Sequence, residues 1–264
     1  MLLAIDLELY VSKPLPLISW SGAFVSMLAR NVVKCVGEGL NLVAVSPLVD
    51  KDWRPVLSGR RVRQYREQVV LEVGTNLRTR ITYEILSEST AIGQHLITCV
   101  QELLSRYGLE VAAIEFKFLD KHAVDDLPRD VPHAQQYLLS LQFYPTIFVF
   151  RGWRVLYPSP SRLIYSLARA VSKHYELRYE NMKKLVHKLT RYIELLRDGT
   201  GIVELEIGSN RTIKAFWGEV LYGVYGYENM SILRLLLSLG EIINVGKSRG
   251  IGFGSIKLLH IKPL

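Results

Sequence analysis

The sequence has few of the features that would place it in several familiar classes of protein. It contains two cysteines, Cys35 and Cys99, whose spacing matches neither a zinc motif nor a disulfide framework, so we expect two buried thiols. No apolar run approaches the roughly 18 residues of a membrane-spanning helix. The opening stretch MLLAIDLELYV carries Asp6 and Glu8 and is a poor signal peptide. We therefore expect a cytoplasmic protein with no membrane partner.

The glycine-rich segment NVGKSRGIGFG, residues 244–254, contains Gly-Lys-Ser but lacks the rest of a Walker motif. That motif needs a glycine five positions before the Gly-Lys pair, where this chain has Glu241, and it follows a strand and opens a helix. Here a leucine-rich helical stretch precedes the glycines and a β-rich stretch follows them. A dinucleotide fingerprint fails on the same order of elements. Glycines let backbone N–H groups approach a polyanion closely, and an ordinary glycine-rich turn is the alternative.

Positive charge is unevenly distributed along the chain. The formal net charge is +8 over 264 residues. Residues 151–197 hold eleven Lys and Arg against three Glu, and residues 54–80 hold seven Arg against two Glu. Segregated positive charge of this kind favours a polyanionic partner, such as RNA, DNA or an anionic membrane surface, over a uniformly solvated surface. A solvated helix face remains the alternative for residues 151–197.

Hydrophobic periodicity predicts the same order of elements in each half of the chain. The expected strands are 1–11, 41–48, 69–74, 78–86, 109–119, 136–144, 146–150, 201–208, 211–226 and 251–262. The expected helices are 20–36, 90–107, 159–175, 179–198 and 230–243. The apolar positions that mark the first helix are Ala23, Met27, Ala29, Val33 and Val36. The Arg-rich stretch 54–66 is expected to be an exposed loop or hairpin.

This order predicts an α+β protein with tandem ferredoxin-like (RRM-like) βαββαβ domains. We expect one domain at 1–120, a linker at 121–135, and a second domain at 136–264 that contains the glycine-rich loop 246–254. RNA-recognition modules share this topology and stack bases on aromatic side chains. Five aromatic residues crowd one segment of the second half, and strand alternation predicts that about half of them are core. They are Phe216, Trp217, Tyr222, Tyr225 and Tyr227.

Three passages of the chain resemble the CRISPR-associated endoribonucleases of the Cas-six family, within the RAMP superfamily. The first is SMLARNVVKCVGEGLNLVAVSPL at 26–48, a helix, glycines and a strand that ends in Ser-Pro-Leu. The second is FYPTIFVFRGWRVLYPSPSRLIYSLARAV at 143–171, with a Pro-Thr step and a Pro-x-Pro pair. The third, 216–258, closes on the family's glycine-rich loop, with glycines at 246, 250, 252 and 254.

The resemblance implies a basic cleft that holds CRISPR repeat RNA, and metal-independent cleavage without a cofactor. The RNA supplies its own nucleophile, the 2′-hydroxyl. The implied partners are the repeat RNA and other CRISPR effector-complex subunits, and a homodimer is left open. The RNA-binding residues implied are those of the loop: Gly246, Lys247, Ser248, Arg249, Gly250, Gly252 and Gly254.

The chain departs from the family at the histidine that many members carry near the end of the first helix. Its six histidines all lie elsewhere: His95, His122, His133, His174, His187 and His260. Arg30 and Lys34 share one face of the first helix, and Lys51 follows the next strand. We expect Lys34 to transfer a proton or supply charge and Arg30 and Lys51 to contact phosphate, although the two helix residues could equally form a solvated face.

Three functions stay open at this point. The first is a repeat-RNA endoribonuclease, and the second is a catalytically inactive RNA-binding subunit of a CRISPR effector complex. The missing histidine keeps the second reading open. The third is a phosphate-binding metabolic enzyme that uses Gly-Lys-Ser, against which the spacing and order of elements argue.

Overall fold

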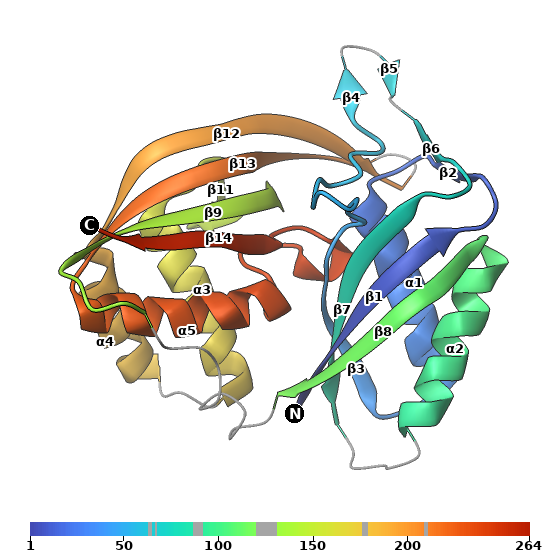
Figure 1. Cartoon of the computed structure of the whole chain (residues 1–264), viewed down its shortest axis with the longest axis horizontal. Helices are drawn as coiled ribbons and strands as arrows, with labels where there is room; N and C mark the ends of the chain where they lie inside the picture. The colour runs from blue at the N-terminus through green and yellow to red at the C-terminus, as the bar shows by residue number, and fades with distance from the viewer. Residues whose placement is uncertain (63–64, 67, 87–91, 120–130, 176–178, 209–210) are drawn as a thin grey trace. The chain divides into compact units, whose positions relative to one another are not determined.

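The computed structural model describes residues 1–62, 65–66, 68–86, 92–119, 131–175, 179–208 and 211–264 (Figure 1). Two compact units form within the chain. Unit 1 comprises Met1–Asp120, Glu204–Ile213 and Gly250–Gly252, and unit 2 comprises Lys121–Val203, Lys214–Arg249 and Phe253–Leu264. The predicted domain boundaries at 120 and 136 stay a prediction, and residues 121–130 of the predicted linker lie outside the described part.

Unit 1 contains a four-stranded antiparallel sheet with two helices on one face (Figure 1). The strand order is β3-β7-β1-β8, which is the order of a ferredoxin-like unit. The bounds are β1 Leu2–Val11, α1 Ser21–Val36, β3 Leu40–Val45, β7 Asn76–Ile85, α2 Ile92–Arg106 and β8 Leu109–Leu119. Two short strand pairs accompany it, β2 Leu15–Leu17 with β6 Val69–Leu71 and β4 Arg61–Val62 with β5 Tyr65–Arg66.

Unit 2 repeats this topology with one more helix (Figure 1). Its sheet has the order β12-β13-β9-β14, again ferredoxin-like, and a separate hairpin is formed by β10 and β11. The bounds are β9 Gln136–Thr146, β10 Phe148–Phe150, β11 Trp153–Val155, α3 Pro160–Tyr175, α4 Tyr179–Thr190, β12 Ile193–Ile207, β13 Arg211–Tyr225, α5 Tyr227–Ile243, η1 Arg249–Ile251 and β14 Ile256–Pro263. The predicted tandem ferredoxin-like fold is therefore confirmed.

Strand alternation builds each core. In β1, Ile5 is buried and pairs with Ile81 on one side and Phe116 on the other, while the next residue, Asp6, faces away from the helices. In unit 2 three phenylalanine rings pack with centroids 5.3 to 6.3 Å apart, and Phe216 is fully buried among them. The buried positions of Phe216 and Tyr222 confirm that part of the aromatic cluster at 216–227 is core.

The prediction of a helix as far as residue 198 was wrong. α4 ends at Thr190, and β12 begins at Ile193. Within β12, Ile193 and Leu195 join the core, while Glu194 and Leu196 are exposed. A short apolar run such as YIELLR is compatible with both the helical period of 3.6 residues and the strand period of two. The run is a strand here because it is hydrogen-bonded beside β13 in the sheet.

Two further predictions need correction. The last strand begins at Ile256, not 251, and residues 249–255 form a 3₁₀ turn and a loop in which Gly252 and Gly254 adopt the left-handed φ angles of +82° and +80°. The buried face of α1 also differs from the predicted one: of the five positions named, Ala29 is buried and Met27 is exposed. The buried apolar positions of α1 are Val25, Leu28, Ala29 and Val32. α1 is apolar on several faces, so periodicity alone did not select the packed one.

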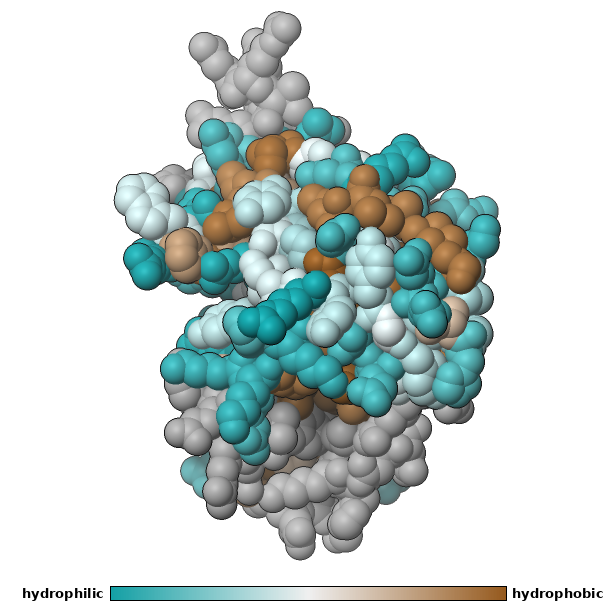
Figure 2. Space-filling view, turned by 90° about the vertical axis from the view of Figure 1, so that its left-hand side faces the viewer, coloured by the Kyte–Doolittle hydropathy of each residue, from teal (hydrophilic) through white to brown (hydrophobic). Residues whose placement is uncertain are grey.

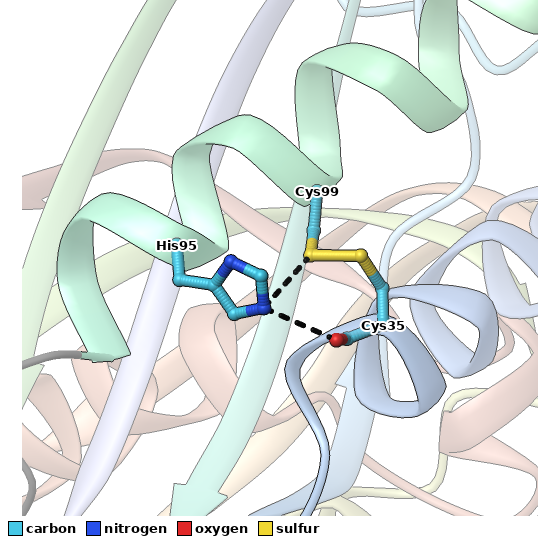
Figure 3. Close-up of side chains that lie close together, drawn as sticks. All are labelled: Cys35, His95 and Cys99. Atoms are coloured by element: carbon cyan, nitrogen blue, oxygen red, sulfur yellow. Dashed lines mark hydrogen bonds between the residues drawn. A yellow bond between two sulfur atoms is a disulfide. The ribbon is translucent and has the colours of Figure 1, made fainter.

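The expectation of two buried thiols was also wrong. Cys35, in the last turn of α1, and Cys99, on α2, form a disulfide with a Cα–Cα distance of 6.0 Å (Figure 3). Cys99 is buried, whereas Cys35 is exposed. The pair joins residues 64 positions apart, and their proximity follows from the packing of α1 beside α2.

The outer face of the unit 1 sheet carries a small ion-pair network. Asp6 accepts hydrogen bonds from Arg80, with Nη2 2.8 Å from Oδ2, and from Lys117 Nζ at 3.0 Å. Burial alone would raise the pKa of the Asp6 carboxyl, but the hydrogen bonds and charges of Arg80 and Lys117 outweigh it and hold the pKa below its ordinary value. Arg78 pairs in the same way with Glu8 at 2.9 Å.

We expect Asp6→Asn to destabilise the fold at neutral pH and to matter less in acid. Because the pKa of Asp6 is lower in the folded chain than in the unfolded one, its carboxylate stabilises the fold above the unfolded pKa of about 3.9. That stabilisation disappears as the pH falls through the folded pKa. The expected loss at pH 7 is about 1–3 kcal/mol, measured by urea denaturation.

Glu8→Gln is the matched control, because it removes a half-exposed ion pair from the same strand. Its expected cost is below about 0.5 kcal/mol. A destabilisation by Asp6→Asn that stayed constant down to about pH 3 would contradict the assigned pKa direction.

No helix among the described residues is long and apolar enough to cross a membrane. The cytoplasmic location expected from the sequence stays a prediction.

On the face of the molecule shown in Figure 2, apolar side chains in brown form patches that hydrophilic side chains in teal interrupt.

Candidate nucleic-acid interface

Backbone packing requires three of the four glycines in the predicted loop, Gly246, Gly252 and Gly254. Gly254 has a φ of +80°, and a Cβ there would lie 1.7 Å from the carbonyl oxygen of Val245. Gly246 has a φ of +72°, and its Cβ would lie 2.4 Å from the carbonyl oxygen of Ile147. The Val245 N–H donates to Gly254 at 2.7 Å, so the two ends of the loop are hydrogen-bonded to each other. These glycines therefore shape the loop.

The tip of the loop, Gly250–Gly252, belongs to unit 1. The Trp20 indole Nε1 donates to the carbonyl oxygen of Ile251 at 3.0 Å, and a Cβ on Gly252 would lie 2.4 Å from the Cα of Gly22. Gly250 differs from its neighbours, because an added Cβ would meet no atom within 4 Å and its φ is ordinary. The fold gives no steric reason for a glycine at 250.

A basic pocket lies within unit 2, beside the loop residues Gly246–Arg249. Its volume is about 920 Å³, and its walls come from β10, α3, α4 and the loop. Among the described residues that line it, five are cationic and none is acidic. The cations are Arg162, Arg169, Lys173, Lys247 and Arg249. Within the described part of the chain, none of the five forms an ion pair.

The loop is held against α3 by specific hydrogen bonds. The Gly246 N–H donates to Ser166 Oγ at 2.5 Å, and the Lys247 N–H donates to the carbonyl oxygen of Ile147 at 2.9 Å. Ser166 lies on the same helix as Arg162 and Arg169, about one turn from each. These bonds bring cations from two distant segments of the sequence to one pocket.

The electrostatics of the pocket favour an anion. Burial lowers the pKa of the Arg249 guanidinium, and the nearby positive charge of Arg169 lowers it further. Arg249 Nη1 donates to the carbonyl oxygen of Ile243 at 3.2 Å, which caps the end of α5 and uses one of the five guanidinium N–H donors. A bound phosphate would relieve the repulsion between the two guanidinium groups through charge-assisted hydrogen bonds.

Exposed aromatic side chains lie on the β10–β11 hairpin and just after it, next to the pocket residues in the sequence. Trp153 is 78% exposed, and Phe150 and Tyr157 are about half exposed. The Arg162 guanidinium lies 4.0 Å from the centroid of the Phe150 ring. Cations interleaved with exposed rings are typical of surfaces that bind single-stranded nucleic acid, because bases stack on the rings while cations contact phosphates. The sequence places this segment in a basic region but gives no signal that singles out these residues.

The predicted catalytic residues lie in unit 1. Arg30 and Lys34 are exposed on α1, with Lys34 in its last turn, and Lys51 is exposed in the turn that follows Val49. Among the described residues, no hydrogen bond or ion pair joins any of the three to another. Their predicted roles therefore stay predictions. Arg78 and Arg80, from the basic stretch 54–80, are engaged in ion pairs.

The histidines whose side chains the structure describes occupy separate environments. His133 stacks on Tyr227 with ring centroids 3.8 Å apart, and His187 and His260 are exposed. His95, on α2, is exposed and its Nε2 lies 3.2 Å from the carbonyl oxygen of Cys35 at the end of α1. His122 lies outside the described residues.

The fold defines a class, proteins built from two ferredoxin-like modules. Comparison with known proteins shows which family within this fold class the chain resembles. Residues 141–256 match the family model of the CRISPR-associated endoribonuclease Cas6, the Cas-six family named above. No curated protein matches the chain.

Solved Cas6 structures share the fold over nearly the whole chain. A product complex of Cas6 (TTHB231) is 16% identical with a TM-score of 0.63, and the match covers 98% of this chain and 100% of that one. Thermus thermophilus Cas6 (TTHB231) is 16% identical with a TM-score of 0.61, covering 98% of each chain. A substrate mimic complex of Cas6 (TTHA0078) is 16% identical, with a TM-score of 0.61 and coverage of 98% and 99%.

Residues 141–256 match the Cas6 family model, and a solved Cas6 structure shares the fold over nearly the whole chain. The resemblance predicted from the sequence is therefore confirmed. The matched residues contain most of the basic pocket, including α3 and the loop as far as Gly254.

Proposed function

We propose that this chain is an endoribonuclease that cleaves precursor CRISPR RNA within its repeats and releases guide RNA, without a metal ion. The observation that carries the proposal is the basic pocket of unit 2, where five cations gather on α3 and the glycine loop and none of them pairs with an acidic residue of the described part. Phosphates of the RNA backbone would occupy it, contacted by the pocket's cations Arg169, Lys173, Lys247 and Arg249. The hairpin aromatics would stack on unpaired bases.

The chemistry needs little more than alignment and proton transfer. The 2′-oxygen attacks the adjacent phosphorus, a 2′-O–P bond forms, and the bond from phosphorus to the 5′-oxygen breaks. The 2′-hydroxyl proton passes to a base, and the leaving 5′-oxygen takes up a proton, so the products are a 2′,3′-cyclic phosphate and a 5′-hydroxyl. Lys34 is the proposed proton-transfer residue, and Arg30 and Lys51 stabilise the charge on the phosphorane.

Incubation of the purified chain with repeat RNA in excess EDTA tests the proposal. We expect cleavage with a cyclic phosphate and a 5′-hydroxyl at the ends of the products. Repeat RNA with a 2′-deoxy substitution at the cleaved position is the matched control, because it keeps every phosphate and should bind without being cut. Cleavage of the deoxy substrate, or cleavage that stops in EDTA, would refute the proposed mechanism.

The alternative is an inactive RNA-binding subunit of a CRISPR effector complex, and the missing histidine favours it. In that case the chain binds repeat RNA and leaves it intact under every condition. The third reading, a phosphate-binding metabolic enzyme that uses Gly-Lys-Ser, conflicts with the order of elements around that triplet, because α5 precedes the loop and β14 follows it.

Replacing Lys34 tests its role directly. We expect Lys34→Ala to slow single-turnover cleavage about 10²–10⁴-fold while changing RNA affinity much less, because a proton-transfer group acts in the transition state. Lys34→Arg is the matched variant, since it keeps the charge but cannot release its proton. If Lys34→Arg restores the rate, Lys34 supplies charge alone, and an unchanged rate in Lys34→Ala would remove it from catalysis.

A further inference from the structure

Three metal-ligating side chains meet where the end of α1 packs beside α2. Figure 3 shows Cys35 on α1 facing His95 and Cys99, which are four residues apart on α2. The possible ligand atoms of the three residues all lie within 4.8 Å of one another. His95 Nε2 is 3.9 Å from Cys99 Sγ, and Cys35 and Cys99 are joined as a disulfide. The ring of His95 thus points at the sulfur pair.

The donor set and its spacing suit zinc. Two thiolates and one imidazole nitrogen are ligands that Zn²⁺ prefers, with Zn–S near 2.3 Å and Zn–N near 2.0–2.1 Å. At a tetrahedral angle those bond lengths place a nitrogen and a sulfur ligand about 3.6 Å apart. The distance from His95 Nε2 to Cys99 Sγ is already 3.9 Å. Residues i and i+4 of one helix share a face, so α2 supplies both ligands without a change of backbone.

Zinc binding at this place requires one change, the reduction of the disulfide between Cys35 and Cys99. Two sulfurs bound to one zinc lie about 3.8 Å apart, which requires the covalent bond between Cys35 and Cys99 to be reduced. Cys35 is exposed, so its side chain is accessible to a reductant and has room to rotate. A dithiol would supply two electrons and two protons and become oxidised to its own disulfide. Zinc would then displace the two thiol protons.

We propose that the reduced chain binds one zinc ion through Cys35, His95 and Cys99, with water as the fourth ligand. The disulfide and the zinc site are then two exclusive forms of one cross-link between α1 and α2. A cytoplasmic compartment keeps thiols reduced and would favour the zinc form, whereas oxidation would release the metal and form the disulfide. This inference is independent of the proposed function.

Metal titration of the full-length chain, without a histidine tag, tests the proposal. The chain is reduced with a phosphine, stripped of metal and titrated anaerobically with Co²⁺ and then Zn²⁺. We expect one equivalent of Co²⁺ to bind with a thiolate-to-cobalt charge-transfer band, and Zn²⁺ to displace it. Because the chain has only two cysteines, that band reports on this pair alone. The oxidised chain should bind no metal at this site.

Variants separate the site from adventitious binding. Cys99→Ser should abolish the charge-transfer band of a two-thiolate site, and His95→Gln should weaken zinc binding at least about tenfold while keeping both sulfurs. His187→Gln, at an exposed histidine on α4, should change nothing. Binding by reduced wild type that is no tighter than that of a Cys35→Ser, Cys99→Ser double variant would overturn the proposal. So would equal zinc affinity in the His95→Gln variant.

Discussion

Gly254→Ala is expected to destabilise the chain by about 3–5 kcal/mol, among the largest losses that a single methyl group can cause. The added Cβ would lie 1.7 Å from the carbonyl oxygen of Val245, and the φ of +80° is strained for any residue with a side chain. The backbone cannot move aside easily, because the Gly254 N–H donates to Pro145 at 2.9 Å and its carbonyl accepts from Val245 at 2.7 Å. Urea denaturation measures the loss.

Gly250→Ala is the matched control in the same loop. Its Cβ would meet no atom within 4 Å, so its unfolding free energy should stay within about 0.5 kcal/mol of wild type. If the loop backbone lies against RNA as proposed, this variant should still bind RNA more weakly, because the methyl group keeps the backbone from the phosphate. Equal stability of the two variants would contradict the described loop geometry.

Replacing Arg169, Lys173 and Lys247 together by Gln is expected to weaken repeat-RNA binding about a thousandfold. Each charge-assisted contact to phosphate contributes about 1.5 kcal/mol or more, and three of them correspond to about three powers of ten. The slope of log Kobs against log salt concentration should also become shallower by about 2, at about 0.7 for each phosphate contact with a single strand. Filter binding or fluorescence anisotropy at several salt concentrations measures both quantities.

A control triple variant removes the same net charge elsewhere. Lys13, Arg106 and Lys262 are exposed and do not line the pocket, so their replacement by Gln lowers the total charge equally. We expect an affinity loss of less than about tenfold from the general change in potential. Equal losses in the two triple variants would show that RNA binding depends on total charge, and the pocket would lose its assigned role.

Much of the fold follows from local pattern. Alternation of apolar and polar residues from Ile5 to Leu9 predicts β1, and the turn glycine at 108 separates α2 from β8. Patterns of this kind predict the β-α-β-β-α-β order in both halves. Hydrophobic periodicity does not predict the structure of residues 191–198, because their short apolar run is compatible with both a helix and a strand. Pairing with β13 makes this run a strand. Periodicity also fails to choose the buried face of α1, because that choice depends on which strand residues the helix meets.

The sequence by itself determined the two repeats, the glycine loop and the concentration of positive charge at 151–197, because each is a property of neighbouring residues. Only the tertiary structure decided which cations share a pocket, since the bond from Gly246 to Ser166 joins positions 80 residues apart. It likewise decided that Cys35, His95 and Cys99 meet at the contact between α1 and α2. Their spacing along the chain matches no known ligand pattern, and proximity that arises from helix packing has no local signature.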